Sequence, residues 1–107
     1  MNVSTNRPTR LSALGEGIVA RWHSERIGAF NGNHLRFRVM DAAAADWHVH
    51  EASDELFLVL SGVVDLDTGH DTHTLAPGDL FVVPAGVRHR ARVAGRATLL
   101  VADAFPA

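Results

Sequence analysis

Short segments in which polar and apolar residues alternate recur along most of this chain, and they constrain its fold more than any other feature. From His34 to Met40 successive residues alternate between two faces, with Leu35, Phe37 and Val39 on one of them, and a period of two is typical of a strand with one buried face. We predict further strands at residues 18–22, 47–50, 55–60, 63–67, 73–75, 80–83, 89–93 and 97–102. About eight or nine short strands with no substantial helix indicate an antiparallel sandwich or barrel.

Turns that contain glycine or proline separate these segments. Pro77-Gly78 fits the two central positions of a type II turn, in which glycine supplies the positive φ. We also expect turns at residues 30–33 and 84–86 and a hairpin tip at residues 68–71. Residues 41–46 are rich in alanine and are predicted to be a connector.

The length of the chain favours one domain. At 107 residues it has no room for a second independent core. Residues 1–12 are polar and contain Pro8, so we expect a flexible N-terminal arm followed by a single domain over residues 13–107. Without cysteine the chain can form neither disulfides nor thiol-dependent sites.

Charge and hydropathy argue against several kinds of partner. The net charge is -2, whereas nucleic-acid-binding proteins usually carry a basic excess. The apolar stretches are too short to span a bilayer, and the first ten residues lack an apolar signal region. We therefore expect a cytoplasmic protein that binds neither nucleic acid nor membrane. All ten basic residues are arginine, which excludes a Schiff-base lysine.

Four side chains could carry the chemistry. His48 and His50 are two apart, so on a strand both imidazoles leave the same face, roughly 6–7 Å apart. Glu55 opens the next predicted strand, and His89 adds a third imidazole from a distant stretch. A single histidine is often only a surface or core residue, and the His48–His50 pair alone also occurs without a metal. The combination of all four residues is what predicts a metal site. Three imidazoles and a carboxylate suit Mn, Fe, Co, Ni, Cu or Zn and leave positions for water or substrate.

The spacing of these residues resembles the two motifs of the cupin superfamily. The first is read as His48-Val49-His50, four residues, Glu55, six residues and Gly62, and the second as Gly78, five residues, Pro84-Ala85-Gly86, two residues and His89. The stretch is similar to small single-domain bacterial cupins of the mannose-6-phosphate-isomerase-like type. Ala42 stands where the family pattern has a glycine, and Val93 where it often has an asparagine.

The resemblance implies an all-β fold, a double-stranded β-helix or jelly-roll barrel, with one divalent transition metal near its open mouth. His48, His50, Glu55 and His89 would be the ligands, and strand parity then places Phe57 and Ala91 among the residues that line the pocket. Two orientations stay open for Arg36 and Arg38. If their face lines the barrel, they favour an anionic substrate; otherwise they form an ordinary solvated face.

The same resemblance implies a metal-dependent enzyme of dioxygenase, isomerase or lyase type that acts on a small oxygen-rich molecule. Glu55 would be both a ligand and the catalytic base. The alternative is a non-catalytic binding or sensing module with a structural metal. An open sheet edge on so small a domain also predicts a homodimer.

Overall fold

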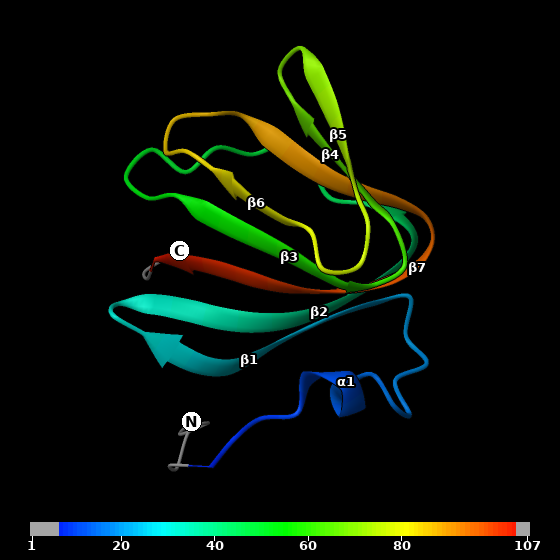
Figure 1. The fold of residues 1–107 in the computed structure, drawn as a ribbon. Coiled ribbons are helices and arrows are strands. Elements are labelled where there is room, and N and C mark those ends of the chain that lie inside the picture. Colours follow the sequence, from blue (N-terminus) through cyan, green and yellow to red (C-terminus); the bar gives the residue numbers. More distant parts are fainter. Residues whose placement is uncertain (1–6, 105–107) are drawn as a thin grey trace.

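The computed structural model describes residues 7–104, and strands dominate that range (Figure 1). One short helix, α1 (Leu11–Leu14), precedes them. The seven strands are β1 (Trp22–Phe30), β2 (Asn33–Ala44), β3 (Glu55–Ser61), β4 (Val64–Thr68), β5 (Asp71–Leu75), β6 (Leu80–Val83) and β7 (His89–Ala104). The expected all-β fold is confirmed, with seven strands in the described range instead of eight or nine. Residues 1–6 of the predicted arm lie outside the described residues.

Strand β7 connects the two halves of the fold. It is 16 residues long, and its beginning pairs with β4 while its end pairs with β2 and β3. The main sheet runs in the order β1-β2-β7-β3-β6, and the β4–β5 hairpin extends from the first part of β7 (Figure 1). Because one strand serves both parts, the sheet curves around a common core.

The core is made of apolar side chains that all strands except β1 contribute. Its buried members are Met40, Phe57, Val59, Val64, Leu66, Leu75, Val83, Ala91, Val93, Ala97, Leu99 and Val101. Met40 belongs to this cluster, so the face of β2 that it shares with Arg36 and Arg38 is the inner face of the barrel. The opposite face of β2 carries Phe37, which the segment after α1 approaches at Gly15. Both faces of β2 are therefore covered near its middle.

The predicted connector at residues 41–46 is wrong over its first four residues. Strand β2 continues to Ala44 because Asp41, Ala43 and Ala44 pair with β7. The register shifts between Asp41 and Ala43, and Ala42 between them has a φ of 46°. The left-handed region costs an L-residue roughly 1–2 kcal/mol, and this is the position at which the cupin pattern has a glycine. The bulge therefore keeps its backbone shape without the residue that suits it best.

Three other predicted strand boundaries differ from the structure. The strands expected at residues 89–93 and 97–102 are one strand, because Val93 and Arg96 on either side of Ala94-Gly95 stay paired with the bulged end of β2. The strand expected at residues 18–22 starts only at Trp22 and runs to Phe30. Strand β1 lies at the edge of the sheet. It carries polar and charged residues on both faces, so its sequence lacks the alternation of polar and apolar residues that predicts a strand. The strand expected at residues 47–50 is reduced to one bridge between His48 and His89.

An ion-pair cluster fastens β4 to the outer face of β7. Asp67 is buried and accepts hydrogen bonds from Arg92 Nε at 2.7 Å, Arg90 Nε at 2.9 Å and Thr72 Oγ1 at 2.6 Å. The hydrogen bond from Arg92 outweighs burial and holds the pKa of the Asp67 carboxyl far below its usual value. Arg90 and Arg92 thus point away from the core, as parity predicts, but they are paired.

Strand β6 is the other edge of the main sheet. Leu80 and Val82 on it are 56% and 45% exposed, which leaves an apolar strip beside unpaired backbone groups. The homodimer expected from an open sheet edge stays a prediction. Within residues 7–104, no helix is long and apolar enough to cross a bilayer.

Ala42→Gly is expected to stabilise the protein. Relief of the left-handed alanine outweighs the extra entropy of glycine in the unfolded chain, so we expect a gain of about 0.5–1 kcal/mol in the free energy of unfolding, measured by urea denaturation. Ala44→Gly is the matched control, because Ala44 is also exposed in β2 and is not among the positive-φ residues; it should destabilise the protein. A loss of stability in both variants would contradict the account of the bulge.

Asp67→Asn is expected to lower the free energy of unfolding by about 1–3 kcal/mol at pH 7, because it removes charge-assisted hydrogen bonds. The pKa of Asp67 is lower in the folded protein than in the unfolded chain, where it is near 4. Its contribution to the free energy of unfolding is therefore fully present above pH 4 and is lost progressively as the pH falls from 4 toward the folded pKa. The difference from the unaltered protein should therefore narrow by about 1 kcal/mol at pH 3. Asp71→Asn, at an exposed position on the neighbouring strand, is the control. An equal difference at both pH values would refute the assignment.

Candidate metal centre

A single backbone bridge brings two of the predicted ligands together. The His48 N–H donates to the His89 carbonyl and the His89 N–H donates to the His48 carbonyl, both at 2.9 Å. His89 is the first residue of β7, so the bridge ties the segment between β2 and β3 to the start of that strand. The imidazoles of His48 and His89 consequently lie with their ring centroids 4.2 Å apart.

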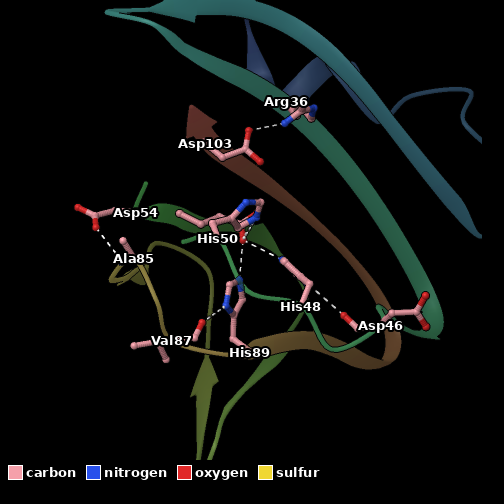
Figure 2. Close-up of polar contacts among 10 residues, drawn as sticks. Arg36, Asp46, His48, His50, Asp54, Ala85, Val87, His89 and Asp103 are labelled. Atoms are coloured by element: carbon pink, nitrogen blue, oxygen red, sulfur yellow. Dashed lines mark hydrogen bonds and ion pairs between the residues drawn. The ribbon is translucent and has the colours of Figure 1, made fainter. Parts of the chain in front are cut away.

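The turn at residues 84–86 fixes the other side of the group. The Gly86 N–H donates to the His50 carbonyl at 2.8 Å, and the Ala85 N–H donates to Asp54 Oδ1 at 3.0 Å. Asp54 therefore stabilises this turn through its side chain. Glu55 follows it directly as the first residue of β3. Residues 48–55 and residues 84–89, which are distant in the sequence, thus meet at one place (Figure 2).

All three imidazoles point at one carboxylate oxygen. Glu55 Oε1 lies 2.6 Å from His89 Nε2, 3.0 Å from His48 Nε2 and 3.2 Å from His50 Nε2. One donor atom from each of the four residues lies within 4.8 Å of every other. Metal–ligand bonds of about 2.0–2.2 Å separate the ligand atoms of one ion by about 3–4 Å. The four side chains could therefore hold one metal ion with small adjustments.

Backbone carbonyls orient two of the rings from behind. His89 Nδ1 lies 2.8 Å from the Val87 carbonyl oxygen, and His48 Nδ1 lies 3.1 Å from that of Asp46 (Figure 2). A carbonyl accepts only, so each Nδ1 carries a proton and donates it. Nε2 of the same rings donates to Glu55 Oε1 in this structure, and loss of that proton to a metal would leave Nε2 with its lone pair and Nδ1 still donating, which is the arrangement that metal-binding histidines usually have. The donor set fits a divalent first-row transition metal.

The group lies where the core meets solvent. The side chains of His89 and Glu55 are 1% and 4% exposed, while those of His50 and His48 are 20% and 35% exposed. Phe57 packs against His89 with ring centroids 5.8 Å apart. Ala91, which follows His89 by two residues on the same face of β7, is also buried. The closed side is therefore apolar and the open side is formed by the two histidines of the His-Val-His motif.

Charge in the group is balanced around Glu55. Burial raises the pKa of the Glu55 carboxyl, but hydrogen bonds from His89 and His48 outweigh it and leave the pKa below its usual value. Burial lowers the pKa of His89, but its hydrogen bonds to Glu55 and to the Val87 carbonyl leave the pKa above its usual value. The carboxylate is thus ionised at neutral pH, as a metal ligand has to be.

The structure also places the predicted pocket residues. Arg36 and Arg38 lie on the inner face of β2, with Val101 and Leu99 of the core as their cross-strand partners. Arg36 forms an ion pair with Asp103, and Figure 2 shows this pair on the side of β2 and β7 toward the histidines. Sequence analysis missed Asp103, because the predicted strand ended at residue 102. Its parity with Leu99 and Val101 is the signal that could have found it.

Comparisons with known proteins agree with the fold. The model of the Cupin domain family matches residues 35–104. Among curated proteins, the uncharacterized protein YdbB of Bacillus subtilis is 35% identical over 71 residues, which are 65% of this chain and 53% of that protein. The uncharacterized protein SCO3923 of Streptomyces coelicolor is 37% identical over 51 residues, 48% of this chain and 49% of that protein. The chain thus spans about half the length of the curated relatives that it matches.

Solved structures show the same architecture. A cupin-2 domain protein from Shewanella frigidimarina superposes with a TM-score of 0.82 at 20% identity, over 90% of this chain and 93% of that one. TT1209 from Thermus thermophilus superposes with a TM-score of 0.78 at 28% identity, over 91% of this chain and 95% of that one. The jelly-roll barrel that the motifs imply is therefore confirmed.

We expect elemental analysis of the protein, purified without chelators or a metal column, to find about one divalent transition-metal ion per chain. His48→Ala should lose most of this metal, because it removes one of four donors. His70→Ala is the control, since His70 is exposed at the β4–β5 hairpin tip. Adding metal at a hundredfold excess over its dissociation constant should stabilise the unaltered fold by about 2.7 kcal/mol. Equal metal content in both variants would contradict the assignment of the site.

Proposed function

The chain belongs to the cupin family, and we propose that it is an enzyme that uses one divalent metal ion, held by His48, His50, Glu55 and His89, to act on a small oxygen-rich molecule. The observation that carries this proposal is the exposure gradient across the four side chains. Two of them are almost fully buried and two are partly exposed. A closed structural site usually surrounds its ion, whereas a catalytic site keeps an open position.

The donor set supports the same proposal. Three imidazoles and one carboxylate leave one or two coordination positions of a five- or six-coordinate ion for other ligands. When bound, such an ion supplies Lewis acidity toward adjacent substrate oxygens, and iron or manganese supplies redox chemistry with dioxygen as well. Dioxygenase, isomerase and lyase reactions all fit this chemistry, and the fold does not choose among them.

The chain's own residues have separate roles in the proposal. The Val87 and Asp46 carbonyls keep the rings of His89 and His48 in fixed orientations. Glu55 is the proposed base, with Oε1 as the atom that accepts a proton from the substrate. Its position at the base of the open side places this oxygen between the buried His89 and the more exposed His48.

The competing function is a binding or sensing module in which the metal has a structural role. The two functions differ in whether small molecules exchange at the metal. We expect manganese-loaded protein to increase the relaxation rate of water protons, because water exchanges rapidly at an open position. A manganese-loaded protein that leaves water relaxation unchanged has a closed site, and that result favours the module.

Turnover is tested with a panel of hydroxy acids, oxo acids, diols and sugar phosphates, followed by proton NMR. We expect the metal-loaded protein to convert at least one compound and His50→Ala to lose more than about a hundredfold in rate. Glu55→Gln separates the two roles of Glu55, because the amide oxygen can still bind metal but cannot take a proton. If Glu55→Gln with a full metal complement turns over at an unchanged rate, Glu55 is not the base.

A further inference from the structure

The inner face of β1 and β2 carries an excess of positive charge. Arg36 and Arg38 lie on this face of β2, and Arg26 lies opposite Arg36 on β1 in the antiparallel register. Cross-strand partners project from the same side of a sheet, so the three guanidinium groups share one face. The same face holds Met40 of the core.

This face leads directly to the candidate metal centre. Across the sheet, Arg36 pairs with Val101 on β7, and Val101 pairs with Phe57 on β3. Glu55 lies two residues before Phe57 on the same face of β3. The row of residues that contains Arg36 is therefore adjacent to the row that contains Glu55. The field of Glu55 also acts on Arg38, which places both groups in one electrostatic environment.

The two central arginines differ in how their charges are compensated. Arg36 is paired with the carboxylate of Asp103, which is 6% exposed. Arg38 has no such partner among residues 7–104: its guanidinium lies over the ring of Trp22, with Cζ 5.1 Å from the centroid. Its buried Nε makes no hydrogen bond to any described residue. Buried donors without partners are rare, because each one loses its hydration without replacement.

The chemistry of the missing acceptor follows from this geometry. A guanidinium offers its Nε and one Nη as a planar fork, and a carboxylate accepts both hydrogen bonds at once. Of the two central arginines, Arg36 is already neutralised by Asp103, so the charge of Arg38 is the one that remains for a ligand. A single fork matches one carboxylate better than a phosphate dianion, which usually needs several donors.

We propose that Arg38 binds a carboxylate group of the substrate, so that the molecule that this site accepts is a small carboxylic acid with a further oxygen that reaches the metal centre. This inference rests on the proposed function and specifies its substrate class. Trp22 packs against the guanidinium, and the pair of Arg36 and Asp103 keeps the neighbouring position neutral.

Binding of glycolate to the zinc-loaded protein, measured by isothermal titration calorimetry, tests the proposal without any turnover. Arg38→Met should bind glycolate roughly tenfold to a hundredfold more weakly, because two charge-assisted hydrogen bonds are lost. The variant should fold, since it replaces a half-buried cation that has no ion pair among the described residues with an apolar side chain of similar length. Arg21→Met removes the same charge from an exposed position and should bind glycolate as the unaltered protein does.

Two further probes separate the outcomes. Ethylene glycol has no carboxylate, so its affinity should not depend on Arg38. Glycolate affinity in Arg38→Met within twofold of the unaltered protein would overturn the proposal, and so would a dependence on Arg38 that appears with inorganic phosphate and not with glycolate. Glycolate binding that depends on Arg38 but is equal with and without zinc would leave the carboxylate site standing and remove support from the proposed metal-dependent function.

Discussion

Strand β7 is the element on which the rest of the structure depends. Its beginning pairs with β4, and its end pairs with β2 and β3, so both parts of the barrel share one backbone. His89 is its first residue and is bridged to His48, while Asp103 near its end is paired with Arg36. The inner face of this strand thus carries one candidate metal ligand, His89, near one end and one member of an ion pair, Asp103, near the other, separated by apolar core residues.

The electrostatics of the barrel interior follow from this arrangement. Glu55 is buried among three imidazoles and has no other acidic residue in its group. The three imidazoles compensate the negative charge of Glu55 only in part. A metal cation bound here would neutralise that carboxylate directly, and this gain favours metal binding by a preassembled group of ligands. On β2 the situation is reversed, because the half-buried cation Arg38 lacks an ion pair within the described range. One part of the interior is suited to a cation and the neighbouring part to an anion.

The residues of the candidate site were predictable from the sequence because they are local. His48, His50 and Glu55 lie within eight residues, and the turn before His89 is marked by Pro84 and Gly86. The orientation of Arg36 and Arg38 could not be predicted, because a period of two defines two faces but not which one is inside. Phe37 on the other face is equally buried, since the segment after α1 covers it. The continuity of β7 was also not predicted, because the two expected strands, 89–93 and 97–102, are joined by the pairing of Val93 and Arg96 with a bulged β2, which the sequence does not show.

The central claim is that these four side chains hold one metal ion at the mouth of the barrel. A crystal structure of the metal-loaded protein, with an anomalous difference map at the absorption edge of that metal, tests this claim most directly. The account predicts one peak per chain, about 2.0–2.2 Å from Nε2 of His48, His50 and His89 and from a carboxylate oxygen of Glu55. A peak bound by other residues, or a fully loaded protein in which Glu55 still contacts the three imidazoles with no ion between them, would contradict it.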